Sequence, residues 1–202
     1  FTPFKIYPGF LETYIYENKS ALSWFLRTNK LSHPETFISA DREETIKYLD
    51  TAYFPIVAKT LIGAAGSGIK IIRDRKNAIS YINKAFSSGI KRRLGPNRNT
   101  GSPKTWIIKS IQSPEYLIKK LKQYKERNQD IQKNMVVFQQ YIPHDFEWRC
   151  VRIGVSYFAY KKLKIGLKAS GSKKFEYGNP PLELLNFTKD LCESCLLYTS
   201  DA

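Results

Sequence analysis

Residues 54–72 read FPIVAKTLIGAAGSGIKII, and this stretch decides how the rest of the chain is interpreted. An apolar run that contains a proline (residues 54–58) and a second β-branched run (residues 69–72) are typical of two short strands. Small residues lie between the runs, with glycines at Gly63, Gly66 and Gly68. Glycine adopts positive φ and lets backbone N–H groups approach a ligand closely, so such a loop can bind a phosphate group. The stretch therefore predicts a strand, a glycine loop and a second strand.

The glycine loop has three competing interpretations. A Walker P-loop needs Gly-Lys-Ser/Thr followed by a helix, whereas Gly68 precedes the strand-like segment 69–72. A dinucleotide-binding fingerprint also requires a helix after the loop, so the same segment argues against it. A glycine-rich hairpin that binds no ligand stays open on the loop alone, because glycine turns between strands are common.

Lys59 is the residue that favours a ligand-binding loop. It ends the first predicted strand, directly before the loop, where its ammonium group can reach a phosphate bound by the loop amides. The pattern Pro-x-Val-x-Lys at residues 55–59, followed by a glycine-rich segment, resembles the ATP-grasp fold. In that fold a mobile flap closes over the ATP phosphates. The resemblance assigns to the flap Gly63, Gly66, Ser67 and Gly68.

The composition is that of a globular protein. Hydrophobic residues make up 42% and aromatic residues 14% of the 202 residues, which allows a sizeable core in one or two domains. No apolar run reaches the roughly 18 residues that a membrane-spanning helix needs, and the first residues lack the pattern of a signal peptide. We therefore expect no membrane partner. Because the sequence does not begin with Met, we expect its first residue to be a truncation point and not the true N-terminus of the protein.

The net charge of +15 is concentrated in residues 91–133, which hold twelve lysines and arginines against three acidic residues. A basic surface suits nucleotide phosphates, an acidic substrate or a nucleic acid, and a solvated surface without a partner stays open. The rival interpretation is therefore a basic nucleic-acid-binding module with strongly salt-dependent binding. No RNA- or DNA-binding motif occurs in the sequence to support it.

The cysteines do not form a disulfide framework or a set of zinc ligands. The sequence has only three, Cys150, Cys192 and Cys195, and the last two make one isolated C-x-x-C. This usage favours a reducing, cytoplasmic location.

Polar residues that precede apolar periodic segments predict three helix starts, at Asn18, Asp41 and Asp74. Glu44 makes the second start resemble a capping box, and Gly89 is expected to close the third helix. Residues 1–16 are expected to be irregular.

Lys19 lies in the first turn of the first predicted helix, where a cation is unfavourable against the helix dipole unless an anion is nearby. In the ATP-grasp resemblance, a lysine at such a helix start contacts the nucleotide phosphates. An ordinary surface lysine is the alternative.

The C-terminal half is rich in predicted strands. Residues 135–142 (MVVFQQYI) predict a buried strand. Residues 148–153 and 157–162 predict a hairpin around Gly154, which fits the first central position of a type II′ turn. In that hairpin Arg149 and Lys162 lie at neighbouring ends of the two strands.

These strands resemble the RimK-like branch of the ATP-grasp enzymes. Gln140, Tyr141 and Ile142 take the places of a Q-E-F-I-type strand end, which forms the adenine hinge in that branch. Glu147 and Arg149 take the places of its D-x-R motif, with Glu instead of Asp. In the family the acidic residue lies near the ribose, and the arginine lies near the transferred phosphate and the acyl intermediate.

Two lysines complete the resemblance. Lys162 stands where an arginine or lysine is usual at the end of the hairpin. Lys168, in the segment KASGS, replaces the arginine of an F-R-A-S-G-S segment, which keeps the charge but loses the bidentate geometry. The resemblance implies that both lysines act with Arg149 in catalysis.

The resemblance implies an α+β ATP-grasp fold with two α+β subdomains and the nucleotide between them, truncated at both ends. The expected order begins with the end of an upstream domain or a linker helix (residues 1–34) and a small subdomain with the flap (35–89). A basic insertion with a helix (90–134), an incomplete large subdomain (135–194) and a non-native tail (195–202) are expected to follow.

The resemblance also implies an ADP-forming ligase. Such enzymes use ATP and Mg²⁺ to convert a carboxylate into an acyl phosphate, from which an amine then displaces phosphate. The acidic Mg²⁺ ligands are expected in strands beyond the end of this chain, so the fragment is expected to bind ATP weakly and to turn over little or nothing. A non-catalytic ATP-binding domain stays open. The identities of the carboxylate and the amine do not follow from the sequence.

Overall fold

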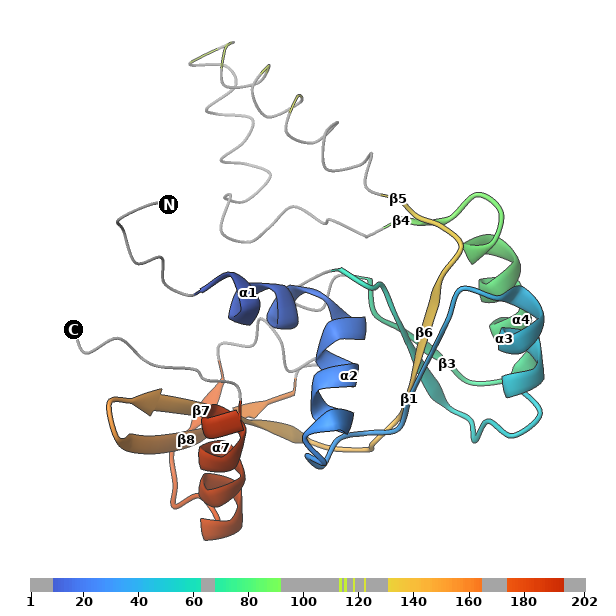
Figure 1. The fold of residues 1–202 in the computed structure, drawn as a ribbon. Helices are drawn as coiled ribbons and strands as arrows, with labels where there is room; N and C mark the ends of the chain where they lie inside the picture. The colour runs from blue at the N-terminus through green and yellow to red at the C-terminus, as the bar shows by residue number, and fades with distance from the viewer. Residues whose placement is uncertain are drawn as a thin grey trace. The chain divides into compact units, whose positions relative to one another are not determined.

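A computed structural model of the chain describes residues 9–62, 68–91, 113, 115, 118, 122, 131–164 and 174–194. The described residues fall into two compact units. The first unit contains those up to Thr36 and from Gln140 onward, and the second contains those from Phe37 to Gln139. Both units combine helices and strands, which confirms the α+β class (Figure 1).

The second unit is built on a four-stranded sheet with the order β1-β6-β2-β3. The strands are β1 (Thr36–Ser39), β2 (Ile56–Lys59), β3 (Lys70–Ile72) and β6 (Val136–Gln140). The two strands predicted around the glycine loop are confirmed, since β2 and β3 pair antiparallel with Ile56 opposite Ile72. Their β-branched residues favour the pleated, half-buried environment of a sheet.

Two helices of the second unit, α3 (Arg42–Tyr48) and α4 (Arg75–Ala85), pack against each other beside this sheet (Figure 1). Each begins at the aspartate predicted as its cap. The Asp41 carboxylate accepts a hydrogen bond from the backbone N–H of Glu44 at 2.9 Å, and the Asp74 carboxylate accepts one from Asn77 at 2.8 Å. These bonds satisfy N–H groups that have no partner within the helix.

The capping box at Asp41 is incomplete, which differs from the prediction. The carboxylate of Glu44 accepts a hydrogen bond from Ser39 Oγ instead of returning to the Asp41 N–H. That N–H donates to Ser39 Oγ at 2.9 Å. A serine at the end of β1 therefore takes the place that the Glu44 side chain would fill in a full capping box.

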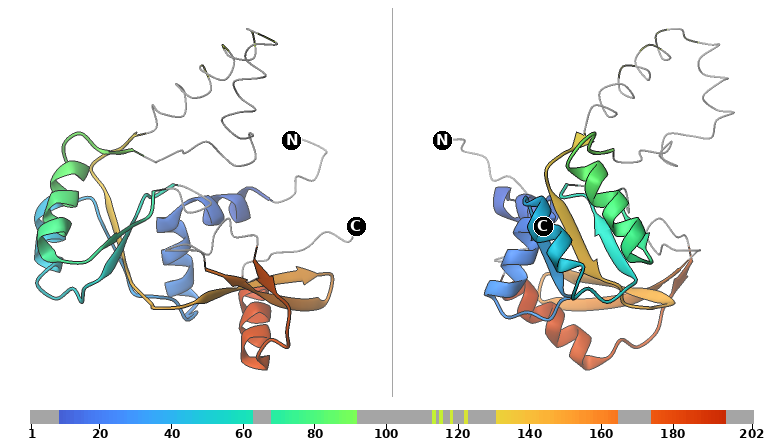
Figure 2. Two further views of the ribbon diagram at one scale, coloured as in Figure 1. Left: turned by 180° about the vertical axis from the view of Figure 1, so that it is seen from behind. Right: turned by 90° about the vertical axis from the view of Figure 1, so that its right-hand side faces the viewer.

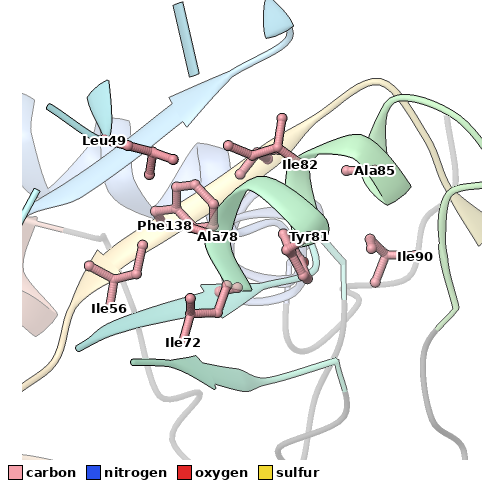
Figure 3. Close-up of a cluster of buried hydrophobic side chains, with 11 residues drawn as sticks. Leu49, Ile56, Ile72, Ala78, Tyr81, Ile82, Ala85, Ile90 and Phe138 are labelled. Atoms are coloured by element: carbon pink, nitrogen blue, oxygen red, sulfur yellow. The ribbon is translucent and has the colours of Figure 1, made fainter. Parts of the chain in front are cut away.

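Apolar side chains from the sheet and both helices form the core of the second unit (Figure 3). Phe138 of β6 is fully buried, and its ring lies 5.8 Å from that of Tyr81 on α4. Complete burial of one large aliphatic or aromatic side chain stabilises a fold by roughly 1.5–3 kcal/mol. The cluster consists of Leu49, Ile56, Ala58, Ile72, Ala78, Tyr81, Ile82, Ala85, Ile90, Val136 and Phe138.

Gly89 closes α4 as predicted. Its φ is +83°, and its N–H donates to the carbonyl of Lys84 at 2.8 Å. The chain then enters β4 (Ile90–Lys91), which pairs antiparallel with β5 (Ile131–Gln132). The basic segment predicted between these strands lies outside the described residues except at positions 113, 115, 118 and 122, of which the last three are helical.

The first unit contains α1 (Phe10–Glu17) packed against α2 (Lys19–Thr28). Asn18 caps α2 as predicted, accepting hydrogen bonds from the N–H groups of Ser20 at 2.9 Å and Ala21 at 3.2 Å. The prediction that residues 1–16 are irregular is wrong for α1. Phe10 and Tyr14 lie four positions apart and stack at 6.1 Å, which is the spacing of neighbours on one helix face.

A three-stranded antiparallel sheet completes the first unit, with α7 (Leu182–Ser194) packed against β8 (Figure 2). Its strands are β7 (Phe146–Ile153), β8 (Ser156–Leu163) and β9 (Phe175–Glu176). The predicted hairpin is confirmed, with Ile153 opposite Ser156 and a positive φ of 57° at Gly154. Val155 does not share the positive φ, so the turn has the dihedral pattern of type II′.

The predicted boundary at residue 135 differs from the structure. β6 was expected to open the large subdomain, but it joins the sheet of β1, β2 and β3, and the chain leaves the second unit at Gln140. The physical reason is burial: Val136, Val137 and Phe138 are at most 1% exposed, and the first and last of these belong to the core of this unit. The other subdomain ranges stay predictions.

Candidate functional site

The base of the glycine loop is closed by a backbone hydrogen bond, in which the N–H of Thr60 donates to the carbonyl of Gly68 at 3.2 Å. Gly68 has φ +73°, and a Cβ on it would lie 2.2 Å from Oγ1 of the buried Thr60. Only glycine fits this position without displacing its neighbour. Three of the predicted loop residues, Gly63, Gly66 and Ser67, lie outside the described residues.

Gln132 supports Leu61, the second residue after β2. Its Oε1 accepts a hydrogen bond from the backbone N–H of Leu61, and its Nε2 donates to the carbonyl of Met135 at 3.0 Å. The Thr60 hydroxyl also donates to the carbonyl of Ile62 at 3.0 Å. The N-terminal end of the loop is therefore held by the side chain of Thr60 and by Gln132, which comes from a separate segment of the second unit.

Lys59 ends β2 and is half-buried at the base of the loop. Its Nζ donates a hydrogen bond to Oε1 of Gln139, which lies on the adjacent strand β6. Sequence analysis singled out Gln140 and missed Gln139. No local signal pointed to it, because the order of the strands in the sheet creates the contact. Gln139 accepts this bond through its side-chain carbonyl oxygen and so orients the ammonium group of Lys59.

The predicted adenine hinge begins at Gln140, the last residue of β6. The N–H of Gln140 donates to the carbonyl of Glu35 at 2.8 Å, which anchors the end of the strand. Tyr141 is half-buried and Ile142 is 49% exposed. Among the described residues, no backbone hydrogen bond engages the N–H of Tyr141 or Ile142, so extended backbone with open donors and apolar side chains is present here.

His144 connects this hinge to Glu147 and was not singled out from the sequence. Its Nδ1 lies 2.7 Å from the carbonyl oxygen of Ile142, and its Nε2 lies 3.6 Å from Oε1 of Glu147. The ring of His144 therefore bridges the carbonyl of Ile142 and the carboxylate of Glu147. His144 thereby positions the carboxylate that the resemblance assigns to the ribose.

The hairpin places three predicted residues on one face of its sheet. Glu147 lies directly opposite Lys162, and Arg149 lies opposite Tyr160, so these side chains point to the same side. Arg149 is exposed and Lys162 is half-buried. Two cations and one carboxylate on a single face can contact a ligand that carries both phosphate and hydroxyl groups. Lys168 lies outside the described residues.

Lys19 is the first residue of α2 and is half-buried. Its Nζ donates to the carbonyl of Tyr16 at 3.3 Å. Burial lowers the pKa of Lys19, and the neighbouring carboxylate of Glu17 partly offsets this effect. An anion at this helix start would favour the charged lysine, but the phosphate contact itself stays a prediction.

The described residues do not supply a Mg²⁺ site. No group of three or more His, Cys, Asp or Glu side chains among them is arranged to hold a metal ion. The same part of the chain contains no helix with the length and apolarity needed to cross a membrane.

The fold of this chain is similar to that of several solved structures. An ATP-grasp RimK domain protein from Sphaerobacter thermophilus matches with a TM-score of 0.54 and 16% identity over 90% of this chain and 51% of its own. The chain has the ATP-grasp fold. A D-alanine–D-alanine ligase from Bacillus anthracis matches with a TM-score of 0.52 and 15% identity, over 89% of this chain and 48% of its own.

A third ATP-grasp neighbour is D-alanyl-alanine synthetase A from Vibrio cholerae, with a TM-score of 0.51 and 10% identity over 89% of this chain and 46% of its own. The chain thus spans about half the length of the solved structures it matches. No family model matches the sequence, and no curated protein matches it. At identities this low, the similarity shows the fold alone.

Proposed function

We propose that this chain is part of an ATP-dependent carboxylate–amine ligase of the RimK-like branch, which forms ADP. The observation that carries the proposal is the Lys59–Gln139 pair at the base of a glycine loop, within an ATP-grasp fold. A lysine at the base of such a loop can donate hydrogen bonds to an anionic ligand. A cytoplasmic location belongs to the same proposal and rests on the free thiols of Cys150 and Cys192.

In the proposed reaction, a carboxylate oxygen of the substrate attacks the γ-phosphorus of ATP. The bond from that phosphorus to the β–γ bridging oxygen breaks, and ADP leaves. An amine then attacks the acyl carbon of the acyl phosphate, phosphate leaves, and the amine loses a proton to give an amide. Stabilising the negative charge on the transferred phosphoryl group is the main catalytic task.

The proposed roles divide among three sets of residues. The adenine contacts the hinge formed by Gln140, Tyr141 and Ile142, and the ribose contacts Glu147. The phosphates contact Lys19, Lys59 and the loop residues Gly63, Gly66, Ser67 and Gly68. The acyl phosphate contacts Arg149, Lys162 and Lys168.

Magnesium is expected as a partner of ATP in such a ligase, but the described residues do not fit its ligand requirements. We therefore assign no step of the reaction to residues that bind it. Water must be kept from the acyl phosphate, and closure of the glycine loop is the proposed means.

The test is calorimetric titration of the chain with ATP in the presence of Mg²⁺. We expect Lys59→Ala to abolish measurable binding, because it removes the cation at the base of the loop. Lys47→Ala is the matched control, since Lys47 is an exposed lysine in the last turn of α3. Absence of ATP binding to the unmodified chain, or equal effects of the two substitutions, would contradict the proposal.

A further inference from the structure

One face of the β7–β8–β9 sheet combines cations with aromatic side chains. Opposite residues on antiparallel strands share a face, so the register arranges this face in rows. The first row across the three strands consists of Glu147, Lys162 and Phe175. The second row begins with Arg149 and Tyr160, and the ring of Tyr177, just after β9, lies 5.8 Å from that of Tyr160. The third row pairs Val151 with Phe158.

Within the described part of the chain, the two cations of this face have no ion-pair partner. Among the residues that the structure describes, neither Arg149 nor Lys162 forms an ion pair, while the neighbouring Lys161 on the opposite face is paired with Glu176 at 3.3 Å. The carboxylate of Glu147 is turned toward His144. Arg149 and Lys162 therefore present positive charge that an anionic ligand can neutralise.

The aromatic side chains next to these cations are open to solvent. Tyr177 is 79% exposed, Phe158 52% and Phe175 45%. The rings of Tyr160 and Phe175 meet edge to face with centroids 5.6 Å apart, so they form one continuous apolar surface. The other face of the hairpin differs, because α7 packs against β8 and buries Cys192.

We infer that this face binds the carboxylate substrate of the proposed ligase, and that this substrate carries an aromatic or similarly large apolar group. The inference rests on the proposed function for the reaction. The carboxylate contacts Arg149 and Lys162, and the apolar group lies over Tyr160, Phe158 and Tyr177. The direct opposition of Arg149 and Tyr160 brings the charged and the apolar part of the face within the span of one small molecule.

A hydrophilic or acidic side chain on the substrate would gain nothing from the aromatic row. A ring placed there buries apolar area on both partners, and aromatic contacts of this kind contribute about three- to tenfold in affinity. The class of substrate is therefore an aromatic or bulky apolar carboxylic acid rather than a small or acidic one.

The experiment is a ligand-observed NMR titration of the full chain with 3-phenylpropionate. Propionate lacks the ring, and 3-phenylpropan-1-ol lacks the charge. We expect 3-phenylpropionate to bind about fivefold or more tightly than either comparator, since only it engages both parts of the face.

Substitutions locate the site. We expect Tyr160→Ala and Tyr177→Ala each to weaken binding of 3-phenylpropionate by about three- to tenfold. Arg149→Gln should remove the preference for the acid over the alcohol. Trp24→Ala is the control, because Trp24 is a 61% exposed aromatic residue on α2 whose loss should leave binding unchanged. Circular dichroism verifies that each variant folds, and the high exposure of Tyr177 makes its replacement the mildest of the set.

Equal affinity for the three ligands, or equal effects of Trp24→Ala and Tyr177→Ala, would overturn the inference. So would displacement of 3-phenylpropionate by ATP, because the aromatic row would then be the adenine site. A parallel ATP titration separates the two proposals. ATP binding without discrimination among the three ligands overturns only the inference, whereas discrimination without ATP binding supports the site and contradicts the proposed ligase.

Discussion

Replacing Gly68 by alanine tests the geometry at the base of the glycine loop. An L-residue at φ +73° costs about 1–2 kcal/mol in backbone conformation. The new Cβ would lie 2.2 Å from Thr60 Oγ1, so the buried threonine must rotate and lose its hydrogen bond to Ile62. That loss adds about 1 kcal/mol. We expect Gly68→Ala to lower the free energy of unfolding by about 2–3 kcal/mol.

Urea denaturation followed by circular dichroism measures this effect. With a slope of about 2 kcal/mol/M, the midpoint should fall by about 1–1.5 M. Two glycines provide matched controls: Gly154 also has positive φ but no heavy atom near its would-be Cβ, and Gly178 has neither constraint. Gly154→Ala should therefore cost about 1–2 kcal/mol and Gly178→Ala almost nothing.

The steric clash between the new Cβ and Thr60 can be tested separately. Adding Thr60→Ala to Gly68→Ala removes the hydroxyl that the new Cβ meets, so the double variant should be more stable than the sum of the two single effects predicts. The reasoning is refuted if Gly68→Ala costs no more than Gly154→Ala.

Three further predictions concern single side chains. Tyr81→Phe should raise the free energy of unfolding by about 1 kcal/mol in thermal denaturation, because its buried hydroxyl has no hydrogen-bond partner among the described residues. Burial also raises the pKa of Tyr81 to about 12, so wild-type stability should fall as the pH rises from 10 toward 12, and the variant should lose this component. Hydrogen bonds from Asn77 hold the pKa of Asp74 below its usual 3.8, so its contribution is present above that pH and is lost as the pH falls through the lowered value. Between pH 6 and pH 3 the urea midpoint should fall less for Asp74→Asn than for the wild type, because asparagine still caps α4 but does not titrate. An equal fall of the midpoint in both proteins would contradict this prediction. Gln139→Ala should weaken ATP binding about tenfold, because it removes a hydrogen bond that orients Lys59, and calorimetry should find this loss smaller than that caused by Lys59→Ala.

The features that could be predicted from the sequence depend on residues close together in the chain. Asn18, Asp41 and Asp74 cap their helices through N–H groups two or three positions away. Gly154 forms its turn within a hairpin whose strands directly adjoin it. The strand–loop–strand around Lys59 is local in the same sense, which is why its resemblance to the ATP-grasp fold could be seen before the structure.

The errors have an equally physical cause. The boundary at residue 135 was misplaced because an apolar run predicts a buried strand without predicting which sheet receives it. The helix α1 was missed because its aromatic residues suggested an irregular segment, although Phe10 and Tyr14 have helical spacing.

By itself, the sequence determined the helix starts, the hairpin turn and the glycine loop with Lys59 before it, since short-range hydrogen bonds and φ preferences decide these. Only the tertiary structure placed Gln139 beside Lys59, Gln132 beside Leu61 and Tyr160 opposite Arg149. The first two contacts join residues 80 and 71 positions apart, and they exist because β6 inserts between β1 and β2 and because β5 returns beside β4. Strand order and register result from burying the whole core at once, and no local pattern in the chain encodes that outcome.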